Sequence, residues 1–178
     1  MTAKASPVAI HGIHHFAYKC RDAEETRHFY EDILGLPLTM CVEANDVKTT
    51  TGETTSFIHF FFEMGDGNYM AFFDFGDGLA PELDAATPKF ANHLAFKVAD
   101  ADAMAQAQRL LEAHDIPYQG PMVHEFVQSI YFWDPNGVRL EYALTVSDAD
   151  ELRAFQEEAP RALARWSERV RQAKRERA

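Results

Sequence analysis

Two histidines occupy the same place in an eight-residue pattern that occurs twice. Residues 15–22 read HFAYKCRD and residues 93–100 read HLAFKVAD, so the His, Ala, Lys and Asp recur at identical offsets. In a strand, alternate side chains point to opposite faces, so each copy presents its His, Ala and Lys on one face and apolar side chains on the other. Imidazoles bind metals and transfer protons. The repeat therefore predicts two strands that each offer one histidine, His15 and His93, to a common cleft.

A carboxylate is the third candidate for this cleft. When the ends of the two copies are aligned, Glu141 falls opposite Ala71. A carboxylate in the apolar segment VRLEYAL is costly to bury unless it is paired or bound to a metal. Two imidazoles and one carboxylate suit iron(II) and leave positions for substrate and dioxygen. We therefore expect His15, His93 and Glu141 to bind a divalent metal, preferably Fe(II), although the same ligands also accept Mn, Zn, Ni or Co.

The surrounding residues predict the same order of elements in both halves. Asp22 and Asp100 follow the two repeats at positions suited to capping a helix, and Glu25 forms a capping box with Asp22. Gly35 and Pro37 close the first of these helices. The expected strands that follow are 38–44, 57–63 and 69–75 in the first half. In the second half we expect a short strand that starts at 116–118, followed by strands at 127–133 and 138–144. Each half therefore reads βαβββ, which makes the fold class α+β.

We expect one domain followed by a helical extension. The expected ranges are a single domain at 1–145, with module 1 at about 11–75, a linker at 76–90 and module 2 at about 91–145, and a C-terminal helical tail at 146–178. Ser147 is expected to open the tail helix, and Pro160 to split or kink it. Apolar side chains recur along the tail at steps of three and four, which predicts a stripe that packs on the domain or on a second subunit.

Composition excludes several classes of partner. The chain has 178 residues and a formal net charge of −11, which disfavours nucleic acid and anionic membrane surfaces. Residues 1–7 lack the apolar core of a secretory signal, so the cytoplasm is the expected location. Cys20 and Cys41 are too few for a disulfide framework and are expected to be reduced thiols. Phenylalanines concentrated at 57–62 and 72–75 favour an aromatic or apolar small-molecule substrate.

The repeat, the glutamate and the preceding YFWDPNG segment resemble the vicinal oxygen chelate superfamily, which includes glyoxalases, bleomycin resistance proteins and extradiol dioxygenases. The resemblance covers about residues 11–145. It implies two βαβββ modules that form a cup-shaped mixed sheet around a metal, with His15, His93 and Glu141 as ligands. Glyoxalase-like members have an acidic fourth ligand where this chain has Ala71, so the chain is most similar to type I extradiol dioxygenases.

The same resemblance implies two catalytic residues. Tyr131 stands ten residues before the glutamate, like the tyrosine that contacts substrate in extradiol enzymes. Those enzymes also have an acid–base histidine where this chain has Gly78. The candidate substitutes are Asp74, Asp77 and His124, of which we take His124 as the possible proton carrier. Two structural alternatives stay open. Tyr131 could be a packed strand aromatic, and the glutamate could form a buried salt bridge with Lys19 or Lys97.

These features favour an Fe(II)-dependent ring-cleavage dioxygenase that acts on a catechol-like aromatic substrate with two adjacent oxygens. The first alternative is a glyoxalase-like or epimerase-like lyase or isomerase, in which a divalent metal is used without dioxygen. The second alternative is a ligand-sequestering resistance protein. The superfamily's habit of pairing modules and the apolar stripe of the tail also predict a homodimer.

Overall fold

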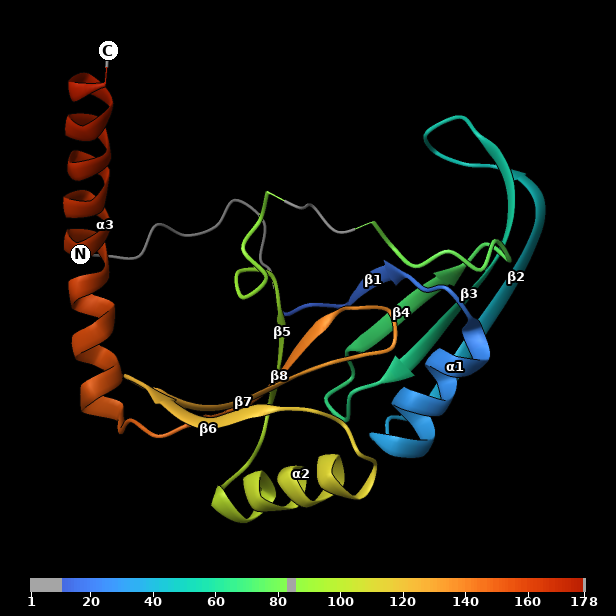
Figure 1. The fold of residues 1–178 in the computed structure, drawn as a ribbon, viewed down its shortest axis with the longest axis horizontal. Coiled ribbons are helices and arrows are strands. Elements are labelled where there is room, and N and C mark those ends of the chain that lie inside the picture. Colours follow the sequence, from blue (N-terminus) through green and yellow to red (C-terminus); the bar gives the residue numbers. More distant parts are fainter. Residues whose placement is uncertain (1–10, 83–85, 178) are drawn as a thin grey trace.

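The structure, a computed structural model, describes residues 11–82 and 86–177, which form two four-stranded sheets, three α-helices and a π-helical segment (Figure 1). The elements are β1 (His15–Lys19), α1 (Ala23–Arg27), the π-helical segment η1 (His28–Ile33), β2 (Leu38–Lys48), β3 (Thr54–Glu63), β4 (Tyr69–Asp74), β5 (Leu94–Lys97), α2 (Ala101–Ala113), β6 (Gln119–His124), β7 (Val127–Trp133), β8 (Arg139–Thr145) and α3 (Ala149–Glu176). Residues 1–7, considered above for a signal, and residues 83–85 of the linker lie outside the described part. The predicted α+β class with two βαβββ modules is confirmed.

The two sheets have the same topology. Sheet A has the strand order β1-β4-β3-β2 and sheet B has the order β5-β8-β7-β6. In each sheet the first and last strands of the module run parallel and the other neighbours are antiparallel. Ala17 pairs with Ala71 in sheet A, and Ala95 pairs with Glu141 in sheet B. This matching register shows that Glu141 and Ala71 occupy equivalent positions of the repeat.

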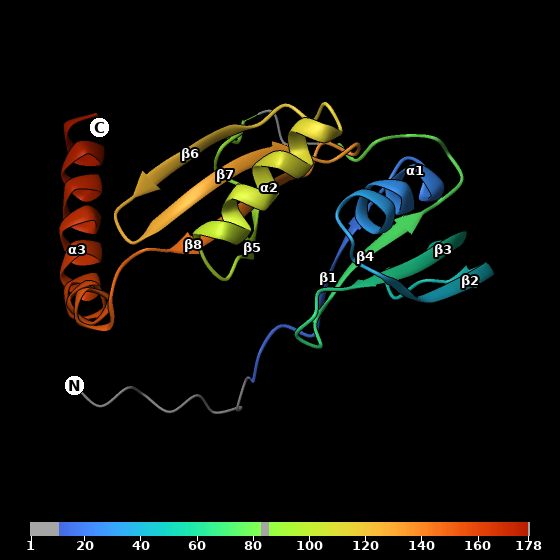
Figure 2. The same ribbon diagram turned by 90° about the horizontal axis from the view of Figure 1, so that it is seen from below.

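The helices α1 and α2 cover the same side of the molecule, at the lower edge of Figure 1 and toward the viewer in Figure 2. Side chains from both modules form one hydrophobic core on this side. Its largest fully buried members are Tyr30, Phe62, Phe72, Phe132, Met70, Leu111, Ile130 and Leu140. Alternation along the strands leaves the opposite face of each sheet, here called the open face, for the site residues.

Local signals in the sequence explain where the helices begin. Asp22 accepts a hydrogen bond from the backbone N of Glu25, and Asp100 accepts one from the backbone N of Ala103, so both predicted caps are confirmed. Glu25, at the third helical position, does not complete the capping box with Asp22, because its carboxylate pairs with Arg21 instead.

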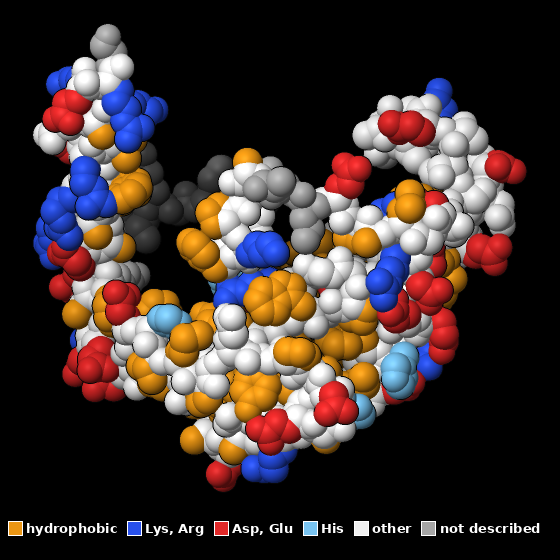
Figure 3. Space-filling view, in the orientation of Figure 1, with side chains coloured by type: hydrophobic (Ala, Val, Ile, Leu, Met, Phe, Trp, Pro, Cys, Tyr) orange, Lys and Arg blue, Asp and Glu red, His pale blue; other side chains and the backbone are white. Residues whose placement is uncertain are grey.

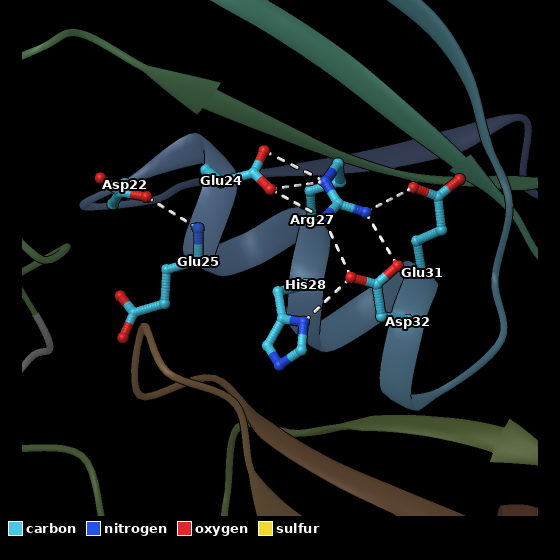
Figure 4. Close-up of polar contacts among 7 residues, drawn as sticks. All are labelled: Asp22, Glu24, Glu25, Arg27, His28, Glu31 and Asp32. Atoms are coloured by element: carbon cyan, nitrogen blue, oxygen red, sulfur yellow. Dashed lines mark hydrogen bonds and ion pairs between the residues drawn. The ribbon is translucent and has the colours of Figure 1, made fainter.

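The α1 and η1 segments carry a network of ion pairs on their surface (Figure 4). The Arg27 guanidinium contacts the carboxylates of Glu24, Glu31 and Asp32, at 2.7, 2.9 and 2.9 Å. His28 contacts Asp32 at 2.9 Å. Hydrogen bonds from Arg27, and next from His28, lower the pKa of Asp32 to about 2. The network lies on the outer surface and spans the junction between α1 and η1, where α-helical hydrogen bonding changes to π-helical hydrogen bonding. We therefore interpret it as a structural network that stabilises this junction.

The turn between β7 and β8 connects the two modules. Asp134 accepts a hydrogen bond from the Tyr30 hydroxyl at 3.0 Å, although burial raises the pKa of this carboxyl. Asn136 donates to the Thr26 hydroxyl at 3.1 Å and accepts from the backbone N of Arg21 at 3.0 Å. The sequence predicted only a turn at this segment. In the structure, the turn also holds module 2 against α1 and η1 of module 1.

Two expected element boundaries are wrong. The short strand expected to start at 116–118 is present as β6, but it begins at Gln119, because Ile116 and Tyr118 pack against the core outside the sheet. Helix α3 is capped by Asp148 rather than Ser147, since Asp148 and Glu151 form a reciprocal capping box. Pro160 was expected to split or kink the tail helix, and the helix is not split there.

The helix continues through Pro160 because residue 156, four positions earlier, is exposed, so water can satisfy its carbonyl group. Within the described residues, no helix combines the length and hydropathy needed to cross a membrane.

Candidate metal centre

The open face of sheet B forms the wall of a hollow of about 570 Å³. Strand register directs Tyr131 and Glu141 to this face from β7 and β8, and His124 reaches it from the end of β6. His93 lies immediately before β5 and also lines the hollow. Four of the five residues predicted to form the site therefore line one hollow, and they come from all four strands of one module or their ends.

Glu141 is 4% exposed and has a partner for each carboxylate oxygen. Oε2 lies 3.0 Å from Nε2 of His93, and Oε1 accepts a hydrogen bond from the Ser129 hydroxyl. The alternative salt bridge with lysine is not present, because Lys19 instead contacts Asp77 at 2.7 Å and no ion pair joins Lys97 to Glu141 in the described residues. The buried carboxylate is thus held by one hydroxyl and one imidazole.

The His93 ring has a defined orientation. Its Nδ1 lies 3.2 Å from the carbonyl oxygen of Phe90, and a carbonyl can only accept, so Nδ1 carries a proton. The lone pair of the neutral ring is then on Nε2, which faces the carboxylate of Glu141. Two electron-rich atoms at 3.0 Å need a proton or a cation between them. This donor pair, with its outer contacts to Phe90 and Ser129, fits a divalent metal.

Tyr131 and His124 lie beside this pair. The Tyr131 ring centroid is 6.0 Å from that of His93 and 6.2 Å from that of His124. Tyr131 is 9% exposed, and its hydroxyl forms no hydrogen bond with any residue that the structure describes. The ring of Tyr131 is thus packed as a strand aromatic, while its hydroxyl has no partner within the described residues.

His15 lies on sheet A and does not line this hollow. Its Nδ1 is 2.8 Å from Nδ1 of the neighbouring His14. The centroids of Phe61 and His59 lie 5.6 and 6.5 Å from that of His15. Across residues 11–82 and 86–177, no three His, Cys, Asp or Glu side chains are grouped closely enough to hold a metal. A single chain thus brings together two of the three predicted ligands.

The sequence reasoning missed two residues of the site. Ser129 and Arg139 each stand two residues before a predicted site residue, Tyr131 and Glu141 respectively, and so share the open face with them. Strand alternation alone could have identified both. His59 shares the open face of sheet A with His15 and stacks on Phe73, with the ring centroids 3.7 Å apart.

Several solved structures have the same fold. A glyoxalase/dioxygenase from Nostoc punctiforme superimposes with a TM-score of 0.57 and 22% identity over 83% of this chain and 99% of that one. The fosfomycin resistance protein FosX from Mesorhizobium loti gives 0.55 and 22% over 82% and 99%. TnmS3, an antibiotic-binding protein from Streptomyces sp. CB03234, gives 0.52 and 19% over 78% and 98%. These likenesses establish the fold.

No curated protein sequence matches this chain. A family model does match, over residues 12–142, which include β1 to β7 and the first four residues of β8. Together with the two βαβββ modules and their common register, this match shows that the chain belongs to the Glyoxalase/Bleomycin resistance protein/Dioxygenase superfamily.

Proposed function

We propose that this protein is a metal-dependent enzyme, and that its reaction is the extradiol-type cleavage of a catechol-like aromatic compound by dioxygen. The proposal rests on one observation above all, the contact between His93 and Glu141 beside Tyr131 and His124 in one hollow. Aromatic side chains on the open face of sheet A, including Phe61 and Phe73, favour an aromatic substrate.

The residues of the hollow have separate tasks in this reaction. When bound, iron(II) supplies a Lewis acid for two adjacent substrate oxygens and a redox partner for dioxygen. The backbone carbonyl of Phe90 and the hydroxyl of Ser129 orient His93 and Glu141. The free Tyr131 hydroxyl donates a hydrogen bond to a substrate oxygen. His124, exposed at the end of β6, takes up and returns the proton of the substrate hydroxyl.

The third ligand, His15, would come from a second copy of the chain. Each chain holds a His93–Glu141 pair on sheet B and a His15 on sheet A, and these do not meet within the chain. A two-fold axis between two open faces would set sheet A of one copy against sheet B of the other, and would form two equivalent sites. We therefore propose a homodimer in which every site uses residues of both subunits.

The shape of the chain supports this pairing. Figures 1 and 3 show α3 rising at one end of the sheets and the β2–β3 hairpin at the other, both on the open side. In a two-fold pair, α3 of each copy would lie against β2 of its partner. Strand β2 is the edge of sheet A, and it exposes the apolar side chains Met40, Val42 and Val47.

Helix α3 has the surface for such a contact. Its stripe starts at Phe155, whose ring lies 5.8 Å from Phe126, and continues through Leu163 and Trp166, which are 67% and 56% exposed. The last 20 residues hold seven Lys and Arg against two Glu, while the other 158 hold ten Lys and Arg against 26 Asp and Glu. Figure 3 shows mainly acidic side chains at the β2–β3 end. Opposite charges and exposed apolar side chains thus favour a second copy as the occupant.

Metal analysis and oxygen uptake test the proposed function. Protein purified without oxygen should contain about one iron per chain, and should consume dioxygen with at least one member of a panel of catechols. His93→Ala should lose the metal and keep the thermal unfolding transition. Retention of one metal per chain by the folded variant would rule out His93 as a ligand.

A metal-dependent lyase or isomerase reaction is the second candidate. It is favoured by Gly78, which stands where extradiol enzymes have an acid–base histidine. Bound metal without oxygen uptake on any catechol would select this candidate. A folded protein that binds no divalent metal would instead support ligand sequestration, the activity class of the antibiotic-binding TnmS3.

A further inference from the structure

Arg139 is a nearly buried cation on the wall of the same hollow. It lies on β8, two residues before Glu141, and is 8% exposed. Its guanidinium carbon is 4.0 Å from the ring centroid of Tyr131 and 5.5 Å from that of Trp133. Nη1 donates a hydrogen bond to the carbonyl oxygen of Phe90 at 2.9 Å. Two aromatic rings and one backbone carbonyl therefore fix the plane of the guanidinium.

This cation has no acidic partner among the described residues. Within them, no carboxylate lies within ion-pair distance of Arg139, and its Nε is buried without a hydrogen-bond acceptor. Glu141, the nearest carboxylate in the strand, is already bound by His93 and Ser129. Burial of an unpaired charge is costly, and it is normally offset by a counter-charge. The missing counter-charge is the observation that points to a ligand.

The position of Arg139 shows which part of a ligand would meet it. Arg139 and His93 line the hollow on sheet B and also an adjoining hollow of about 680 Å³. The second hollow is bordered by the side chains of Trp133 and Lys89, and its acidic lining residue, Glu82, is exposed and forms no ion pair with Arg139 in the described part of the chain. A ligand that reaches His93 can thus place a second group against Arg139.

We propose that Arg139 binds a carboxylate group of the ligand, so that the substrate class is an aromatic acid with two adjacent oxygens. The adjacent oxygens rest on the metal-dependent function proposed above, whereas the carboxylate subsite does not. A carboxylate is planar, carries one negative charge and matches the planar edge of one guanidinium. A phosphate dianion carries more negative charge and would need more donors than this wall offers.

Binding of benzoate and benzamide to the metal-free protein tests the subsite without the reaction. The two probes have the same shape and differ in charge. Calorimetric titration should show benzoate binding at least about tenfold more tightly than benzamide, which corresponds to about 1.4 kcal/mol. Arg139→Met should abolish this preference. Arg109→Met, which removes the same charge from an exposed position on α2, should retain it.

Thermal unfolding shows whether the variant is folded. Arg139→Met should unfold at the wild-type temperature or above it, since Met fills a similar volume without a buried charge. Benzoate should raise the unfolding temperature of wild type and not that of the variant. Equal binding of the two probes by wild type, or undiminished benzoate binding by folded Arg139→Met, would overturn the carboxylate subsite.

The subsite and the reaction can fail separately. Charge-selective benzoate binding without metal or oxygen uptake would refute the proposed enzyme and keep the subsite. Oxygen uptake with catechols and no selectivity for benzoate would refute the subsite alone. If both hold, 3,4-dihydroxybenzoate should show a lower KM than catechol in wild type, and Arg139→Met should remove that difference.

Discussion

Single residues decide how the candidate ligands are oriented. Ser129 donates to one oxygen of Glu141, and the other oxygen faces His93. Outer hydrogen bonds of this kind hold ligands in place, and their loss typically reduces metal affinity about 10- to 100-fold. Ser129→Ala should therefore weaken Fe(II) binding by this factor in an anaerobic titration. Ser167→Ala on α3, which removes a hydroxyl far from the site, should leave the affinity unchanged. Equal affinities would mean that Ser129 does not support the ligand set.

The two cysteines predict a response to alkaline pH. Cys20 is fully buried, and burial raises the pKa of its thiol from 9.0 to about 11, whereas Cys41 is exposed. Between these values the unfolded chain loses the thiol proton and the folded chain keeps it. The free energy of unfolding should consequently fall as the pH rises from 9 to 11, by up to about 3 kcal/mol from this group.

Denaturant unfolding of three proteins isolates this contribution. Wild type and Cys41→Ala should lose stability in parallel above pH 9, while Cys20→Ala should show a shallower decline from a lower starting value. Burial also raises the pKa of Tyr142, to about 12, so part of the decline is shared by all three proteins. Identical slopes in Cys20→Ala and wild type would contradict the buried-thiol explanation.

At the scale of elements, Gly120 allows β6 to lie close to β7. Its φ of +114° is rarely adopted by residues with a side chain, and an added Cβ would lie 2.5 Å from the backbone oxygen of Ser129. Gly120→Ala should therefore lower the free energy of unfolding by at least about 2 kcal/mol. Gly52→Ala has a similar φ, +102°, and open space around the new Cβ, so it should cost less. If the two variants lose the same free energy of unfolding in denaturant, the backbone must shift to remove the close contact between the new Cβ and Ser129.

The exposed apolar side chains of α3 lead to a prediction about association of the proposed homodimer. Leu163 and Trp166 lie on the stripe that continues from the Phe155 contact, and no described residue buries them. If the stripe packs on β2 of a partner, Leu163→Glu with Trp166→Glu should shift the chain toward the monomer in sedimentation velocity runs. Ala164→Glu adds a charge on the opposite face and should leave association unchanged. A persistent dimer with the double substitution would exclude this contact.

Elements were predictable from sequence where a local rule acts alone. Asp22 and Asp100 cap helices because an extended aspartate can accept from the third helical N–H, whatever the tertiary structure. The rule was ambiguous at Ser147 and Asp148, because both residue types cap helices. Asp148 is the cap in the structure, where Glu151 completes a reciprocal capping box with it. The strand expected to start at Ile116 starts instead at Gln119, because the side chains of Ile116 and Tyr118 pack on the core without a ladder partner. Pairing is a tertiary property that the local pattern does not contain.

At the scale of the whole molecule, the repeat correctly predicted two equivalent modules and the equivalence of Glu141 and Ala71. It could not predict how the modules lie relative to each other. That arrangement depends on side chains distant in sequence, such as the contact of Asp134 with Tyr30 and that of Asn136 with Thr26. The repeat therefore identified histidines on equivalent strands, but it could not show whether they meet within one chain.

Mixing two inactive variants distinguishes a site shared between subunits from a site within one chain. His15→Ala and Glu141→Ala each damage every site of their own homodimer. In a mixed dimer with shared sites, one site carries both substitutions and the other carries neither, so unfolding and refolding equal amounts together should restore about a quarter of the wild-type metal content and activity. A site within one chain would gain nothing, because every chain keeps one lesion.

The matched control is a mixture of His93→Ala and Glu141→Ala. Both substitutions lie on sheet B, so each site of the mixed dimer would still lack one ligand. Restoration in the first mixture and none in the second is the pattern that a shared site requires. No restoration in either mixture, from chains that sediment as mixed dimers, would assign His15 and Glu141 to one chain and exclude the proposed pairing of sheets.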